Sequence, residues 1–246
     1  MNARLRLRDV QLAYGAQPVL RGVDLQLQAG ELVGLIGPNG SGKSSLLRVC
    51  AGLLPPDRGE LRLDGLDPRE APLAVRQRYG YAVEPELLPR ALRPRQCLEL
   101  VARTRRLGAE ALEAALGLSE RLGLSPWLER EVATCSLGTR QKLAVVLALL
   151  GAPPLLLLDE VLNGLDPLAA FALKEELRRR ADDGAAVLLA THGLETAERF
   201  LDRAVLLLDG RIAADWDRAA LQQLRAEREG GLEAAVVRHL RAARAD

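Results

Sequence analysis

The stretch GPNGSGKSSLL, residues 37–47, constrains the fold of this chain more than any other segment. Gly37 and Gly42 are separated by four residues, and Lys43 and Ser44 follow at once. This matches the pattern G-x-x-x-x-G-K-[ST], in which bare backbone N–H groups converge on phosphate oxygens, the lysine reaches the terminal phosphates and the hydroxyl binds Mg²⁺. A glycine-rich turn could share the pattern by chance, so the flanking residues decide between the two interpretations.

The flanks favour a phosphate site. A short apolar strand, ELVGLIG (31–37), precedes the loop, and SSLLRVCAGLL, apolar at helical spacing, follows it. Such a loop attracts anions, because the dipole and the unpaired N–H groups of the helix N-terminus point at the ligand. The predicted phosphate-binding residues are Gly37, Pro38, Asn39, Gly40, Ser41, Gly42, Lys43, Ser44 and Ser45.

Composition limits the possible partners. The 246 residues, 48% of them hydrophobic, are enough for one domain with a large core and an inserted subdomain. Because the 34 basic residues are almost balanced by 33 acidic ones, we expect no nucleic-acid partner. The three cysteines, Cys50, Cys97 and Cys135, show no C-x-x-C spacing, which favours a reducing compartment without a disulfide framework or a metal cluster.

No segment reads as a membrane span or a signal peptide. The longest apolar run, 143–158, is short and is broken by Pro153 and Pro154, so we predict a buried helix, a turn and a buried strand. The N-terminus, MNARLRLRDV, alternates charged and apolar residues as an edge strand would, and it lacks an apolar signal region. We therefore expect a protein that is soluble by itself and cytoplasmic.

The pattern of elements predicts an α/β fold. Residues 1–84 are rich in short strands, with one helix after Lys43; residues 85–150 have helical spacing; and from Leu155 strands alternate with helices. Several strands are uniformly apolar, which indicates a mixed, largely parallel sheet that is covered on both faces. The tail, 218–246, carries Leu232, Val236 and Leu240 on one stripe and is predicted to form helices packed on the body.

A second functional segment is LLLLDE (155–160), which places two carboxylates at the carboxyl end of a buried strand. Ligands of open α/β sheets bind at that edge. There Asp159 can hold Mg²⁺ through water, and Glu160 can polarise an attacking water. Taken alone, the segment could equally be a strand that ends in surface acids.

Four further segments make the whole pattern more specific. They are CSLGTRQKL (135–143), NGLD (163–166), His192 after the strand AAVLLAT, and Tyr14 in LAYGAQPVL. In order and spacing the chain resembles the ATP-binding subunit of ABC transporters over nearly its whole length. The resemblance implies a P-loop NTPase core (1–84 and 151–217), an N-terminal antiparallel β subdomain, a helical subdomain (85–150) with a signature loop, and a C-terminal helical tail (218–246).

The resemblance also implies roles for single residues. Tyr14 would stack on adenine, although it could instead be a cross-strand aromatic; His192 would contact the γ-phosphate or water. Ser136 would face the γ-phosphate of ATP on a second subunit and could also be a helix N-cap. In this resemblance CSLGTRQKL (135–143) is the signature loop and NGLD (163–166) is the D-loop, and their residues expected at that interface are Ser136, Gly138, Thr139 and Asp166. His239 is expected to be structural.

Two features depart from the family pattern. GYAVEPELL offers Glu84 where a glutamine is usual; it could bind Mg²⁺, but it adds a negative charge and could be only a solvated loop acid. The signature loop has Leu137 and Thr139 where Gly and Gln are usual. This form, in a short chain, looks more like subunits of ABC-2-type exporters than of importers.

The sequence therefore predicts an ATPase peripheral to the inner face of the cell membrane. Two copies would bind ATP and Mg²⁺ between them and drive separate transmembrane permease subunits. Ser44, Glu84 and Asp159 would serve the metal, and Glu160 with His192 would serve hydrolysis. The alternatives are a soluble ABC ATPase acting on a macromolecule, an importer subunit, and a GTPase or small-molecule kinase; the last would need a motif such as N-K-x-D, which is absent from the sequence.

Overall fold

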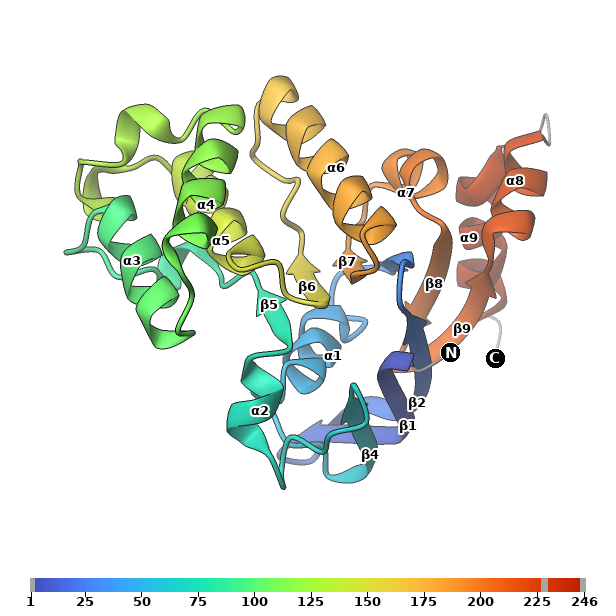
Figure 1. Ribbon diagram of the computed structural model, residues 1–246. Coiled ribbons are helices and arrows are strands. Elements are labelled where there is room, and N and C mark those ends of the chain that lie inside the picture. Colours follow the sequence, from blue (N-terminus) through green and yellow to red (C-terminus); the bar gives the residue numbers. More distant parts are fainter. Residues whose placement is uncertain (1–2, 227–229, 244–246) are drawn as a thin grey trace.

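The computed structural model describes residues 3–226 and 230–243 (Figure 1). Its larger sheet has six strands, parallel except for the last pair. In spatial order these are β5 (Tyr79–Tyr81), β6 (Leu155–Asp159), β7 (Ala186–Ala190), β3 (Leu32–Ile36), β8 (Arg203–Leu208) and β9 (Arg211–Trp216). Strands β3 and β7 are buried along their whole length, which explains their uniformly apolar sequences.

A second, three-stranded antiparallel sheet has the order β2 (Gln17–Gln28), β1 (Ala3–Tyr14), β4 (Arg58–Leu63). Leu5 and Leu7 of β1 are buried while Arg6 and Arg8 are exposed. The prediction of an edge strand at the N-terminus is therefore wrong, because β1 pairs on both sides. Its alternating charges mark a solvated face of the sheet, not an unpaired edge.

Helices occupy most of the described chain between β5 and β6. They are α3 (Pro94–Thr104), α4 (Ala109–Arg121) and α5 (Leu137–Leu149), with 3₁₀ turns η1 (Pro85–Leu87), η2 (Ser125–Trp127) and η3 (Val132–Thr134). This group lies at the β5 end of the sheet (Figure 1). Helix α5 packs tightly there, since a Cβ added at Gly80 would lie 1.9 Å from the Ala148 carbonyl oxygen.

The remaining helices surround the rest of the larger sheet. They are α1 (Lys43–Cys50), α2 (Pro72–Arg76), α6 (Pro167–Asp182), α7 (Leu194–Phe200), α8 (Arg218–Ala226) and α9 (Gly231–Ala242). Helices α8 and α9 lie at the β9 end, opposite α3 to α5 (Figure 1). Leu232 and Val236 of the tail stripe are buried, and the ring of His239 meets the Trp216 ring edge-on at 5.5 Å, as expected for a structural histidine.

Three elements are absent from the sequence prediction: α2, β5 and β9. Helix α2 and strand β5 have five and three residues, too few to show a period. The apolar run 143–158 does form the predicted buried helix, turn and strand, α5 and β6. None of the helices in residues 3–226 and 230–243 is long and apolar enough to cross a membrane.

Candidate nucleotide site

The phosphate loop joins the carboxyl end of β3 to the first residue of α1. Gly37 has φ 155°, and a Cβ at that position would lie 2.3 Å from the Leu207 carbonyl oxygen. Gly42, the residue before α1, has φ 105°. Residues with a side chain rarely adopt such backbone conformations, so both positions require glycine. The strand–loop–helix context expected for the motif is therefore present.

Lys43 is the cation of this loop. Its side chain is almost buried, at 7% exposure, and its Nζ donates to the carbonyl oxygens of Gly37, at 2.8 Å, and Pro38, at 3.1 Å. These neutral acceptors do not compensate the full positive charge. A phosphate oxygen would, so the loop holds an ammonium group suited to an anionic ligand.

A cavity of about 270 Å³ opens beside the loop. It is lined by Tyr14, Val19, Asn39, Gly40, Gly42, Lys43, Ser44, Ser45, Asp159 and Glu160. Tyr14 is the last residue of β1 and is 48% exposed, and its hydroxyl lies 3.4 Å from the Ser45 Oγ. One cavity thus brings together an aromatic ring, the phosphate loop and both predicted carboxylates.

Asp159 is the last residue of β6 and lies next to the loop. Burial raises the pKa of its carboxyl group; a hydrogen bond from Ser44 acts in the opposite direction, and the charge of Glu160 raises the pKa further. Its Oδ1 atom is buried and has no hydrogen-bond partner in the described structure. A buried carboxylate oxygen without a donor is costly, so this atom is suited to a cation or its bound water.

Glu160 is held by two side chains. Its Oε2 lies 3.0 Å from the Nδ1 of His192 and accepts from the Nδ2 of Asn163, also at 3.0 Å. Because an ionised carboxylate only accepts, the shared proton belongs to His192 Nδ1, which leaves Nε2 for another partner. Glu160 also has φ 50°, a strained conformation for a non-glycine residue.

Asn163 was not predicted as a site residue. It belongs to the NGLD segment, and its position three residues after Glu160 is the signal that could have identified it. Its backbone N–H also donates to the Glu160 carbonyl oxygen at 3.0 Å. The turn between the two residues therefore holds Asn163 where its side chain can contact the Glu160 carboxylate.

Glu84 lies three residues after β5 and forms an ion pair with Arg48 of α1. It lines a second cavity, of about 380 Å³, that shares Ser44, Asp159 and Glu160 with the first. The structure thus places Glu84 with the two acids of LLLLDE. Arg48, four residues after Ser44 on the same helix, is a further residue at this site that the motif analysis did not single out.

Leu137 and Gln141 of the signature loop and Asn163 and Gly164 of the D-loop line the second cavity. The four residues expected at the dimer interface, Ser136, Gly138, Thr139 and Asp166, line neither cavity in the described structure. Ser136 is the N-cap of α5, and its Oγ accepts from the Thr139 N–H at 3.1 Å. Asp166 caps α6 by accepting from the Ala169 N–H at 2.9 Å, and it pairs with Lys142 at 2.6 Å. Those bonds give Ser136 and Asp166 structural roles within one chain.

Gly138 shows close packing between these two segments. A Cβ at this position would lie 2.7 Å from the Gly164 carbonyl oxygen. The start of α5 and the D-loop of the same chain are therefore packed backbone to backbone.

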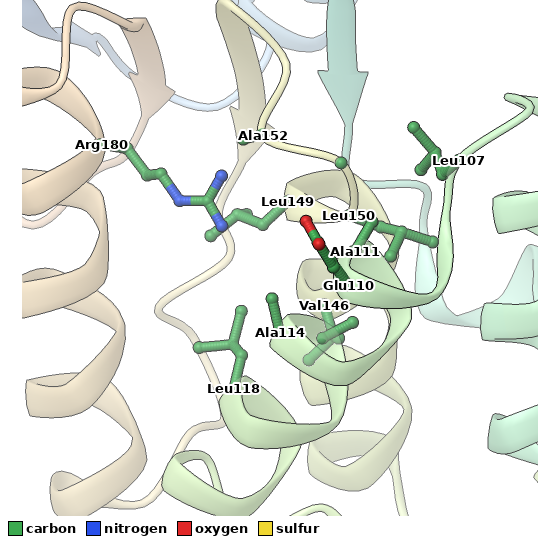
Figure 2. A pocket seen from close by; sticks show the side chains of 12 residues that line it. Leu107, Glu110, Ala111, Ala114, Leu118, Val146, Leu149, Leu150, Ala152 and Arg180 are labelled. Atoms are coloured by element: carbon green, nitrogen blue, oxygen red, sulfur yellow. The ribbon is translucent and has the colours of Figure 1, made fainter.

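A further cavity, of about 310 Å³, lies between α4, α5 and α6 (Figure 2). Arg180 extends into it from α6, toward Glu110 of α4 and Leu149 of α5. Most of its other lining residues are alanines and leucines, and none comes from the phosphate loop or from LLLLDE. This cavity has the Arg180 guanidinium but lacks the glycine-rich loop and the acidic pair that line the nucleotide cavity.

Comparison with known proteins agrees with this geometry. The ABC transporter family matches residues 20–163. The ABC-type transporter ATP-binding protein EcsA of Bacillus subtilis is 36% identical over 94% of this chain and 93% of its own length. Nod factor export ATP-binding protein I of Azorhizobium caulinodans is 35% identical over 84% of this chain and 65% of its own length.

Solved structures give the same result. An ATP-binding subunit of an ABC transporter superposes with a TM-score of 0.88 at 34% identity, covering 96% of this chain and 99% of that chain. A dimeric ATP-binding cassette in a post-hydrolysis state, bound to ADP and Pi, has a TM-score of 0.77 at 26% identity, covering 87% and 98%. With the phosphate loop, Asp159 and Glu160 in one site, this chain belongs to the ABC transporter family and is an ATP-hydrolysing, ATP-binding subunit.

Proposed function

We propose that two copies of this chain bind Mg·ATP between them and drive export through separate transmembrane subunits. The observation that carries the proposal is the Glu160 carboxylate, held by His192 and Asn163 on the rim of the cavity that contains Lys43. A restrained carboxylate beside a phosphate-binding cation is what water activation in phosphoryl transfer requires.

The loop binds the triphosphate. Lys43 exchanges its two carbonyl partners for phosphate oxygens, and the N–H groups of residues 39–45 complete the phosphate cradle. The half-exposed ring of Tyr14 on the cavity wall offers a stacking surface for adenine, a contact that contributes about 1–3 kcal/mol in base–aromatic stacking.

The donors around Ser44 fit Mg²⁺, because they are oxygens and include the partnerless Oδ1 of Asp159. Ser44 and Glu84 would hold the metal directly and Asp159 through water. When bound, Mg²⁺ offsets the charge of the β- and γ-phosphates. Glu160 accepts a proton from the water that attacks the γ-phosphorus, while His192 and Asn163 keep its carboxylate in place.

Residues on a second copy complete the site. Ser136, Gly138, Thr139 and Asp166 line neither cavity of their own chain in the described residues, yet Ser136 opens a 13-residue helix whose N-terminus favours an anion. The dimeric cassette bound to ADP and Pi supports a dimer, in which we place the two copies head to tail. Lys43 of one copy and Ser136 of the other would then enclose one triphosphate.

Transport requires membrane partners. The described helices are too short or too polar to cross a bilayer, so the chain would act at the inner face of the membrane through permease subunits. The word export in the name of the Nod factor relative supports an outward direction.

Dimer formation tests the proposal. In Glu160→Gln, hydrolysis is blocked while binding persists, so ATP should convert monomer to dimer by mass action. Light scattering after size exclusion, with protein on the order of tens of micromolar, compares ATP with ADP. Adding Ser136→Arg should abolish the ATP-dependent dimer. A Glu160→Gln protein that binds ATP and stays monomeric contradicts the homodimeric arrangement.

A further inference from the structure

Arg48 faces β5 and the loop that follows it. It lies in the last turn of α1, the helix that begins with Lys43, and its Nη2 donates to the Oε1 of Glu84. Burial raises the pKa of the Tyr81 hydroxyl, and the nearby Arg48 guanidinium acts in the opposite direction. Arg48 therefore ties the end of β5 and the loop after it to the phosphate-loop helix.

The charges around Ser44 show why this contact matters. The cavity of about 380 Å³ that contains Ser44 is lined by the acids Glu84, Glu86, Asp159 and Glu160. Four carboxylates near a binding site for a polyanion repel that ligand. The positive charges that act on Asp159 come from Lys43 and Arg48. Because Lys43 is committed to the phosphates, Arg48 is the cation that can offset Glu84.

We propose that Arg48 is a positioning residue that allows a carboxylate to occupy this loop: it holds Glu84 in place and neutralises its charge beside the triphosphate. The inference rests on the proposed function, since it concerns ATP at the same loop. Arg48 contacts Oε1 of Glu84, which leaves Oε2 available to the metal, and the pair carries no net charge. Removing one partner should then change ATP affinity in a direction that depends on the partner: loss of Arg48 weakens binding, and loss of the Glu84 charge acts in the opposite direction.

The test is a double-mutant cycle read by equilibrium binding of a fluorescent ATP analogue. Arg48→Ala leaves an uncompensated carboxylate and should weaken binding about fivefold, the scale of a partly exposed charge contact. Glu84→Gln removes the carboxylate, so adding it to Arg48→Ala should restore affinity to within about twofold of wild type. Repeating the titration in EDTA separates this charge effect from metal binding, and the Arg48→Ala loss should shrink at high salt.

Arg95 and Glu129 provide a matched control. They also form an exposed arginine–glutamate ion pair, with side chains 39% and 58% exposed against 37% and 48% for Arg48 and Glu84, but they line neither nucleotide cavity. In the same cycle, Arg95→Ala, Glu129→Gln and the double variant should all bind ATP within about twofold of wild-type affinity. Thermal unfolding of every variant confirms that each is folded.

Two outcomes overturn the inference. If Arg48→Ala binds ATP as well as wild type does, Arg48 offsets no charge at the site. If Arg48→Ala is weak and Glu84→Gln fails to restore it, Arg48 acts on the phosphates independently of Glu84. Loss of binding in Lys43→Ala, measured alongside, distinguishes either result from failure of the proposed function, because that variant reports on the loop itself.

Discussion

Without nucleotide, Asp159→Asn should be more stable than wild type. With bound Mg·ATP, it should be less stable than wild type. The buried Oδ1 of Asp159 lacks a hydrogen-bond partner, and its carboxylate lies next to Glu160. An unsatisfied buried acceptor costs about 1–3 kcal/mol, and more when charged. Asparagine keeps the side-chain shape and an acceptor for Ser44 while it removes the charge. We expect the free energy of unfolding to rise by about 1 kcal/mol, which is about 2–4 °C in melting temperature at this chain length.

Mg·ATP should reverse that order. A ligand at about 100 times its Kd stabilises a protein by about 2.7 kcal/mol, so wild type should overtake Asp159→Asn once Mg·ATP is added. Urea unfolding with and without Mg·ATP measures both differences. Asp183→Asn is the control, because the Asp183 carboxylate is exposed, pairs with Arg179 at 2.8 Å and lies outside the nucleotide cavities; it should not raise stability. A destabilised Asp159→Asn without nucleotide, or an equal gain from Mg·ATP, would refute the reasoning.

Three further predictions concern single residues. Lys43→Ala should weaken ATP binding at least tenfold, since it leaves phosphate charge unpaired, as measured by equilibrium titration. His192→Ala should lower the hydrolysis rate about tenfold or more with little change in ATP affinity, as steady-state kinetics and titration would show. Glu176, 3% exposed, accepts from Arg121, Arg179 and Arg180; burial favours its neutral form, but the hydrogen bonds from Arg179 and Arg180 hold the pKa of its carboxyl group below the usual range. Glu176→Gln should therefore lower the free energy of unfolding by about 3 kcal/mol at pH 7. Because a lowered pKa stabilises the native state only while the carboxyl group is ionised, the difference from wild type in urea unfolding should become smaller as the pH falls below about 4.3.

Local sequence was enough to predict the strand–loop–helix of the phosphate motif and four of the six strands of the larger sheet, β3, β6, β7 and β8. The glycine spacing requires a backbone that only glycine adopts, as at Gly37, and the uniformly apolar β6 can only be buried on both faces. The position of β1 was mispredicted because alternation reports which face of a strand is solvated and carries no information about its neighbours.

The parts of the site that sequence could not predict depend on tertiary contacts. Arg48 reads as an ordinary polar position of an amphipathic helix, and only the approach of the loop after β5 pairs it with Glu84. In the same way, the contact of Asn163 with Glu160 depends on the turn that follows β6. Motifs identify the groups that do chemistry, whereas the side chains that hold those groups come from whichever elements pack nearby.

The central claim is that the Glu160 carboxylate activates water at the Lys43 loop. The most direct measurement is the ATP hydrolysis rate of Glu160→Gln, with ATP affinity determined on the same preparation. Glutamine keeps the size of the side chain but cannot accept the proton, so the rate should fall by a factor on the order of 10² or more while Kd stays within about threefold of wild type. A Glu160→Gln protein that hydrolyses ATP within about tenfold of the wild-type rate would contradict the claim.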